Sequence, residues 1–130
     1  MKIVRYEDIE PVAVDTPGAK GASVRIPIGI ADGAPNFTMR VFTMAPGGNT
    51  PFHRHDYEHE VLIVKGRGEL RLPDRAVQVE PGTAILVPAD QWHGFKADAE
   101  QGLEMVCLVP NRAYTGPIKV EAGPSSRMDD

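Results

Sequence analysis

Short apolar runs recur along the chain and are separated by turn-forming residues. Five such runs, each four to eight residues long, cover residues 24–30, 37–44, 61–64, 83–88 and 103–109. Turn signals such as Asp32-Gly33 and Pro81-Gly82 lie between them. Runs of this length, bounded by Gly and Pro, are typical of β-strands and too short for most helices. With weaker runs included, the pattern predicts about ten strands.

An alternating segment adds a hairpin to this set. Residues 69–72 and 77–79 alternate apolar and polar side chains on either side of Pro73-Asp74-Arg75. Because proline and aspartate favour tight turns, we expect two antiparallel strands joined by this loop. Strands that recur roughly every eight to twelve residues favour a sandwich or a closed barrel, so we predict an all-β fold.

Composition narrows the fold class further. The chain has 130 residues, of which 13 are glycine and 12 are proline, too many helix breakers for a helix bundle. A chain of this length is expected to form one domain. We predict a single barrel domain over residues 1–115. Residues 116–130 are polar and rich in Gly, Pro and Ser, so we expect them to form a loose C-terminal tail.

Charge and hydropathy exclude several classes of partner. The net charge is −4 and no run of Lys or Arg occurs, which argues against nucleic acid and anionic membrane surfaces. No apolar stretch approaches the roughly 18 residues of a membrane-spanning helix, and the N-terminus turns polar too early for a secretory signal. The single cysteine, Cys107, cannot form an internal disulfide. These features favour a cytoplasmic protein.

The four histidines of the chain form the strongest candidate site. Three of them, His53, His55 and His59, fall within seven residues, and His93 follows later. His53 and His55 are two residues apart, so on an extended chain they leave the same face of a strand. Imidazole is the commonest protein ligand for divalent transition metals. We therefore predict that the four histidines bind one ion of manganese, iron, nickel, copper or zinc.

The spacing of these histidines resembles the two motifs of the cupin family. The first motif reads Gly47, five residues, His53-Arg54-His55, three residues, His59, six residues, Gly66. The second reads Gly82, five residues, Pro88-Ala89-Asp90, two residues, His93, three residues, Ala97.

One departure from the first motif leaves two ligand sets open. His59 stands where cupins carry a glutamate, and Glu60 follows it directly. The site could therefore hold four histidines, or three histidines with Glu60. Only one of two adjacent strand residues can face the cavity, and the six-residue spacing to Gly66 favours His59.

The resemblance extends to small single-domain, four-histidine manganese cupins. It rests on residues 34–37, Glu58-His59-Glu60, His93-Gly94-Phe95 and residues 107–110. The resemblance implies a double-stranded β-helix, the cupin jelly-roll barrel. It also implies a homodimer and a bound divalent metal, most plausibly manganese.

Four neutral imidazoles would leave two positions open on a six-coordinate ion, for dioxygen, peroxide or a bidentate substrate. This predicts a metal-dependent oxidoreductase, a dioxygenase or a peroxide-using enzyme, which acts on a small organic molecule and favours an anionic one. Two alternatives remain open: a non-redox isomerase, cyclase or lyase that uses the ion as a Lewis acid, and a cupin that binds a small molecule without turnover.

Strand alternation also predicts the wall of a pocket beside the metal. Phe95 shares a face with His93, and Met105 shares one with Cys107. Cys107 is either inert core or a thiol within reach of reactive oxygen species. Arg40 either enters the pocket, where it would orient a carboxylate or enolate, or faces solvent, as arginines more commonly do. Because both faces of residues 61–64 and 106–109 are apolar, a homodimer is expected to cover the outer face.

Overall fold

Eleven strands and four short helical segments make up the chain, which is described over residues 1–130 by a computed structural model. The strands are β1 (Val12–Ala13), β2 (Lys20–Ile28), β3 (Phe37–Asn49), β4 (His53–His55), β5 (His59–Gly66), β6 (Gly68–Arg71), β7 (Ala76–Val79), β8 (Ala84–Val87), β9 (Gly94–Ala97), β10 (Leu103–Pro110) and β11 (Val120–Ala122). The helical segments are η1 (Tyr6–Asp8), η2 (Ile30–Asp32), α1 (Arg112–Thr115) and η3 (Ser125–Met128). No helix has the length and apolar character needed to cross a membrane. The predicted all-β fold is confirmed.

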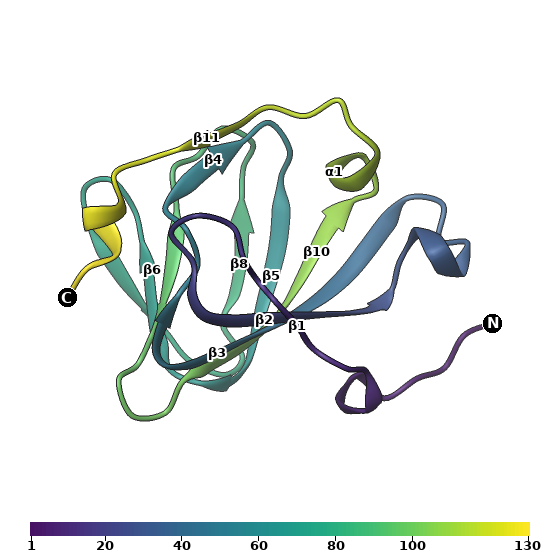
Figure 1. Cartoon of the computed structure of the whole chain (residues 1–130), viewed down its shortest axis with the longest axis horizontal. Coiled ribbons are helices and arrows are strands. Elements are labelled where there is room, and N and C mark those ends of the chain that lie inside the picture. The colour runs from purple at the N-terminus through teal and green to yellow at the C-terminus, as the bar shows by residue number, and fades with distance from the viewer.

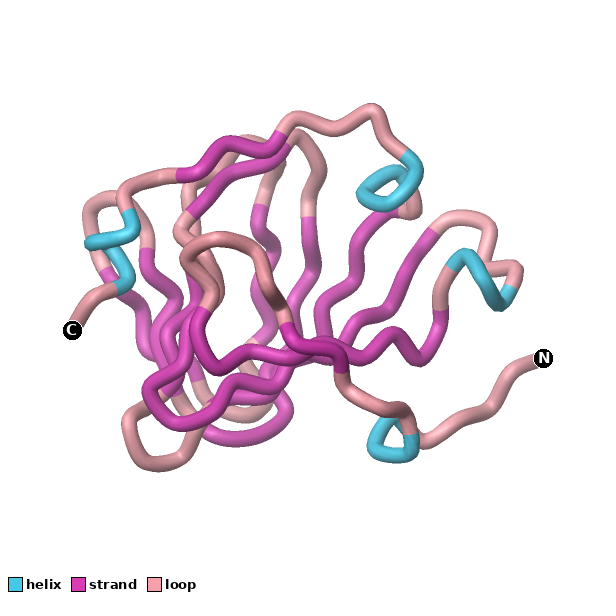
Figure 2. Tube along the Cα trace, in the orientation of Figure 1, coloured by secondary structure: helices cyan, strands magenta, loops and turns pink.

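The strands form one large antiparallel sheet that curls on itself. Its order is β7-β6-β9-β3-β10-β5-β8, and β2, which pairs with β1, joins the same sheet by pairing with β3. A second, two-stranded sheet pairs β11 with β4, and Figure 1 shows this pair lying across one end of the curled sheet. The short helical segments lie at the margins of the curl (Figure 2). The arrangement is that of a jelly-roll barrel with an open end.

Alternation along the central strands builds the core. In β5, His59, Val61 and Ile63 are buried whereas Glu60 and Leu62 are exposed. The odd-numbered residues of β10 from Leu103 to Val109 are buried in the same core. Burying each large apolar side chain stabilises the fold by about 1.5–3 kcal/mol. The interior of the barrel is thus apolar except where histidines replace aliphatic residues at one end.

The predicted hairpin is confirmed, while β3 is longer than its apolar run. Residues Gly68 to Arg71 pair with Ala76 to Val79 in the expected antiparallel register. The apolar run over residues 37–44 predicts a strand that ends near Met44, whereas β3 continues to Asn49. Gly47 adopts a left-handed φ of 77°, which costs a glycine little, and a Cβ on Gly48 would lie 2.7 Å from the Lys20 carbonyl oxygen. These two glycines bend the strand without ending it.

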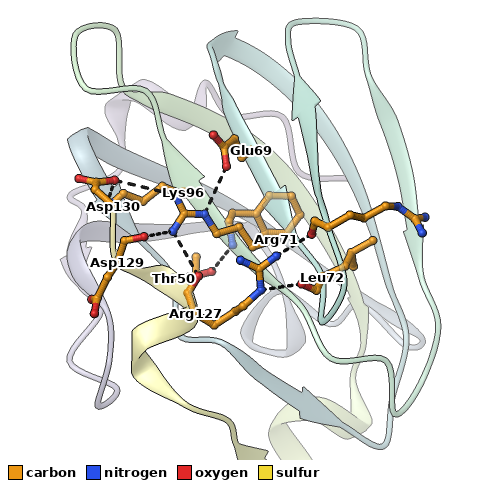
Figure 3. Close-up of polar contacts among 10 residues, drawn as sticks. Thr50, Glu69, Arg71, Leu72, Lys96, Arg127, Asp129 and Asp130 are labelled. Atoms are coloured by element: carbon orange, nitrogen blue, oxygen red, sulfur yellow. Dashed lines mark hydrogen bonds and ion pairs between the residues drawn. The ribbon is translucent and has the colours of Figure 1, made fainter.

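The C-terminal segment differs from the loose tail expected of its composition. Residues Val120 to Ala122 pair with β4, and the side chain of Met128 is buried. Arg71 donates hydrogen bonds to the carbonyl oxygens of Arg127 and Asp129, as Figure 3 shows in part. Backbone pairing and arginine donors, rather than an apolar pattern, order this segment, so its composition gave no sign of it.

Candidate metal centre

Three segments bring the histidines together. His53 and His55 lie on β4, and His59 is the first residue of β5. His93 precedes β9 and forms a bridge with His53, in which each backbone N–H donates to the other's carbonyl oxygen at 3.0 Å. The bridge holds the two side chains next to each other.

Three of the histidines form a compact set of donor atoms. The candidate ligand atoms of His53, His55 and His93 all lie within 4.8 Å of one another. Their ring centroids are 4.9 to 5.1 Å apart. Nitrogens this close can converge on a single ion.

Backbone carbonyls set the protonation of two of these rings. Nδ1 of His55 lies 2.7 Å from the Tyr57 carbonyl oxygen, and Nδ1 of His93 lies 2.7 Å from that of Gln91. A carbonyl oxygen only accepts, so each Nδ1 carries the proton and each Nε2 keeps a free lone pair. Nε2 of His93 is buried and has no hydrogen-bond partner. A buried nitrogen lone pair without a partner suits a metal ion, so the residues present fit a divalent transition metal.

His59 lies in the same cluster but makes different contacts. It is buried whereas Glu60 is exposed, so the histidine rather than the glutamate faces the interior. Its Nε2 lies 2.7 Å from Nε2 of His55, and its Nδ1 lies 3.0 Å from Sγ of Cys107. Two nitrogens bound at right angles to one ion at about 2.1 Å would be about 3 Å apart. His59 is thus close to a ligand position, but the compact set comprises three histidines, and a four-histidine site stays a prediction.

The histidines are held in their neutral form. Burial, followed by repulsion from His93, His55 and Arg40, lowers the pKa of His53 from 6.5 to about 3. Burial also lowers the pKa of His93 to about 4 and that of His55, and it lowers the pKa of His59 furthest. Neutral imidazole is the form that binds a metal, so the cluster requires no deprotonation at pH 7.

A cavity of about 390 Å³ opens beside the histidines. Nineteen residues line it, ten of them hydrophobic, and they include all four histidines. The pocket residues expected from the sequence, Phe95, Met105, Cys107 and Arg40, line it as well. Alternation identified the first three because their strands are regular. The cavity also includes residues that sequence reasoning missed, among them Phe42, Tyr57 and Tyr114. Tyr57 lies within the histidine cluster in the sequence, which was an available signal, whereas the other two are placed by tertiary packing.

Arg40 enters the cavity, so the solvent-facing alternative was wrong. Its Nη2 donates a hydrogen bond to Sγ of Cys107 at 3.1 Å, and its guanidinium carbon lies 4.9 Å from the centre of the Phe42 ring. Arg40 and Cys107 are direct partners in the pairing of β3 with β10. This register, which only strand pairing determines, turns the arginine inward.

Comparison with solved structures places the chain among known barrels. The polyketide cyclase RemF from Streptomyces resistomycificus has a TM-score of 0.85 and 34% sequence identity, and the match covers 94% of this chain and 84% of that one. A cupin-2 domain protein from Rhodospirillum rubrum has a TM-score of 0.78 and 22% sequence identity, and the match covers 98% of this chain and 83% of that one. Because the identity is low, this second likeness shows only that the two proteins share a fold.

Sequence comparison gives a shorter match. The 1-methylthio-D-xylulose 5-phosphate methylsulfurylase of Rhodospirillum rubrum is 35% identical over 71 residues, or 55% of this chain and 46% of that protein. The chain spans about half the length of the curated relatives it matches. Residues 40–109 match the Cupin_2 family, described as a cupin domain. With the barrel and the histidine motifs described above, this match shows that the chain belongs to the cupin family.

Proposed function

We propose that the chain binds one divalent transition-metal ion through its histidines and catalyses a non-redox cyclisation of a small carbonyl compound in the adjoining cavity. The observation that carries the proposal is the set of inward-facing imidazole nitrogens, including the unpartnered Nε2 of His93, beside a largely apolar cavity. The likeness to a polyketide cyclase along nearly the whole chain supports cyclisation as the reaction class.

Each part of the site has a separate task in this proposal. When bound, the ion supplies a Lewis acid that polarises a carbonyl oxygen. The Nδ1 hydrogen bonds of His55 and His93 fix the two rings so that their lone pairs point to one place. Phe95 and Met105 are almost fully buried and line the cavity, where they exclude water and offer an apolar surface to the substrate.

Tyr57 is the hydrogen-bond donor of the proposal. Its ring stacks on His55 with the centroids 4.0 Å apart, and it lines the cavity. Burial raises the pKa of Tyr57 above 10.0, because it disfavours the phenolate. The hydroxyl therefore stays protonated at neutral pH, and it can donate a hydrogen bond to an oxygen on which charge develops.

Manganese remains the proposed metal because of the sequence resemblance, while the histidine set also suits iron, nickel, copper and zinc. An oxidoreductase that uses dioxygen or peroxide has no specific support from the compared proteins. The non-redox alternative agrees better with a polyketide cyclase and a methylsulfurylase among the similar proteins.

The homodimer expected from the sequence is part of the same proposal. On the outer face of the sheet, Leu62 of β5 and Leu86 of β8 are 44% and 60% exposed. A second copy packed on this face would remove both side chains from water. A monomer at micromolar concentration in analytical ultracentrifugation would contradict the dimer and leave the metal site untouched.

The first test of the function is metal content. After reconstitution with Mn²⁺ or Zn²⁺ and desalting, we expect about one equivalent per chain by elemental analysis. His93→Ala should lose most of it, whereas Glu60→Ala should keep it, because Glu60 faces solvent. Loss of metal in Glu60→Ala together with retention in His59→Ala would instead support the ligand set with the glutamate.

The second test is turnover without oxygen. The zinc-loaded chain, incubated anaerobically with a linear poly-β-ketone, should accelerate formation of the cyclised product over the metal-free chain. Activity that appears only with dioxygen or peroxide, and only with a redox-active metal, would replace this proposal with the oxidoreductase.

A further inference from the structure

Arg40 presents an unusual set of hydrogen-bonding groups to the cavity. Nη2 donates a hydrogen bond to the neutral sulfur of Cys107. Nε is closed off from solvent and makes no hydrogen bond. The hydroxyl of Tyr114, which also lines the cavity, is a second hydrogen-bonding neighbour of the guanidinium. The guanidinium therefore has donor capacity that the protein leaves unused.

The charge of Arg40 is uncompensated as well. No carboxylate lies within 4.0 Å of it, since none of the ion pairs of the chain includes this residue. Asp15 is the one acidic residue that lines the cavity, and it is exposed. The histidines near Arg40 are neutral, and a bound divalent ion would add positive charge to the same space. A cation withdrawn from water without a counter-charge is costly, so an anion that enters the cavity would gain a strong electrostatic interaction.

We propose that the cavity takes a planar organic anion, a carboxylate or an enolate, and that Arg40 is the residue that selects it. This inference rests on the proposed function only in treating the cavity as the substrate site. The planar guanidinium is held against the Phe42 ring and tied to Cys107, so its orientation is set before a ligand arrives. A fixed guanidinium matches a planar pair of anionic oxygens better than a flexible ammonium does. Phe95 and Met105 would contact the apolar body of the same molecule.

The test compares ligands that differ only in charge. 2-Naphthoate and 2-naphthamide share one ring system, and only the first is an anion. Dimedone, an acidic 1,3-diketone, supplies an enolate without a carboxylate. Isothermal titration calorimetry on the full chain, both metal-free and zinc-loaded, gives the affinity for each. In the metal-free chain we expect 2-naphthoate to bind roughly tenfold more tightly than 2-naphthamide, since a charge-assisted hydrogen bond is about twice as strong as a neutral one.

The variants assign this preference to one side chain. Arg40→Gln should remove the preference for 2-naphthoate over 2-naphthamide in the metal-free chain. Arg40→Lys should keep only part of this preference, because an ammonium lacks the planar pair of N–H donors of a guanidinium. Arg75→Gln is the matched control, because Arg75 is exposed in the loop between β6 and β7. Retention of the full preference in folded Arg40→Gln would overturn the proposal. So would equal affinities for 2-naphthoate and 2-naphthamide in the unmodified chain together with no binding of dimedone, a result that needs no variant to fold.

The two anionic probes distinguish the sources of charge. Binding of 2-naphthoate but not dimedone in an Arg40-dependent manner identifies a carboxylate site, and the reverse identifies an enolate site. If the chain takes up no metal but still prefers 2-naphthoate through Arg40, the proposed metal-dependent function is contradicted and the anion site is supported. If the chain binds metal and cyclises substrate but Arg40→Gln leaves the preference for 2-naphthoate unchanged, the proposed function is supported and the anion site is contradicted.

Discussion

Two arginines of the large sheet, Arg71 and Arg40, are largely withdrawn from solvent, and the protein surrounds them with different groups. Arg71, on β6, is 8% exposed. It donates to Glu69 at 3.3 Å and to the carbonyl oxygens of Arg127 and Asp129, and Asp130 lies 3.8 Å away. Figure 3 shows these acidic and carbonyl groups gathered round its guanidinium. Arg40, on β3, has the neutral sulfur of Cys107 and the hydroxyl of Tyr114 beside it and no carboxylate.

These different surroundings indicate that Arg71 is a structural cation and that Arg40 is available to bind a ligand. The donors of Arg71 are used to hold the C-terminal segment against the barrel, so the protein itself supplies its counter-charge and acceptors. Arg40 points into a cavity beside metal-binding residue types and keeps donors free. Burial alone does not distinguish Arg71 from Arg40. The two differ in how many of their N–H donors have an acceptor within the protein.

Removing Arg71 should give the largest loss of stability. Arg71→Gln deletes the charged donors to two partly buried carbonyl oxygens, and a hydrogen bond to a charged group is worth about 1.5–3 kcal/mol. We expect the free energy of unfolding to fall by about 3 kcal/mol in urea denaturation, with metal content per folded chain unchanged. Arg75→Gln, at an exposed arginine whose only ion pair is at 3.7 Å, should change stability by less than about 0.5 kcal/mol. Equal effects of the two changes would show that the C-terminal contacts of Arg71 do not stabilise the fold.

A drop in pH should lower the stability of the fold through the histidines near Arg40 rather than through the contacts of Arg71. The folded-state pKa of His93 is lowered to about 4, while the unfolded chain protonates near 6.5. Below pH 6.5 the unfolded state binds more protons, so the stability of the metal-free chain falls as the pH drops toward 4. His93 alone contributes a loss of about 2 kcal/mol between pH 7 and pH 5. Urea midpoints at both pH values measure it.

A matched variant isolates the histidine contribution. His93→Gln should reduce the difference between the two pH values, whereas Arg71→Gln should lower stability by the same amount at both. A wild-type midpoint that does not change between pH 7 and pH 5 would mean that the histidines are protonated within the fold.

Cys107 links the cavity arginine to the histidine cluster, and its replacement should have an intermediate effect. Cys107→Ala removes the acceptor of Arg40 and the neighbour of His59, and it leaves space in the core, so we expect a loss of about 1.5 kcal/mol. Cys107→Ser keeps a polar atom at this position and should lose less. Thermal unfolding of both variants provides the measurement, and a larger loss in the serine variant would show that Cys107 acts as apolar core.

The comparison also shows which parts of the molecule local sequence could predict. The β6–β7 hairpin, the buried face of β10 and the inward turn of His59 rather than Glu60 follow from side-chain alternation, which is a local property. The histidines were identified by their spacing, which the strands then bring together.

Strand pairing between residues that are distant in sequence determines the features that side-chain alternation could not predict. Arg40 turns inward because β3 pairs with β10 in a register that places it opposite Cys107, and no local pattern contains that register. The order of the C-terminal segment likewise depends on β4 and on Arg71, which are distant in sequence. Both of these features involve an arginine whose surroundings come from other strands.

Replacing Arg40 should have the smallest effect on stability of these changes. In Arg40→Gln the protein loses one hydrogen bond to sulfur and is relieved of a cation without a counter-charge, so the two contributions oppose each other. We expect the free energy of unfolding to stay within about 1 kcal/mol of wild type in urea denaturation, although the preference for anionic ligands is lost. A loss as large as that of Arg71→Gln would mean that Arg40 is structural too. A nearly neutral change would show instead that the protein retains this charge for a ligand, because the fold alone gains little from it.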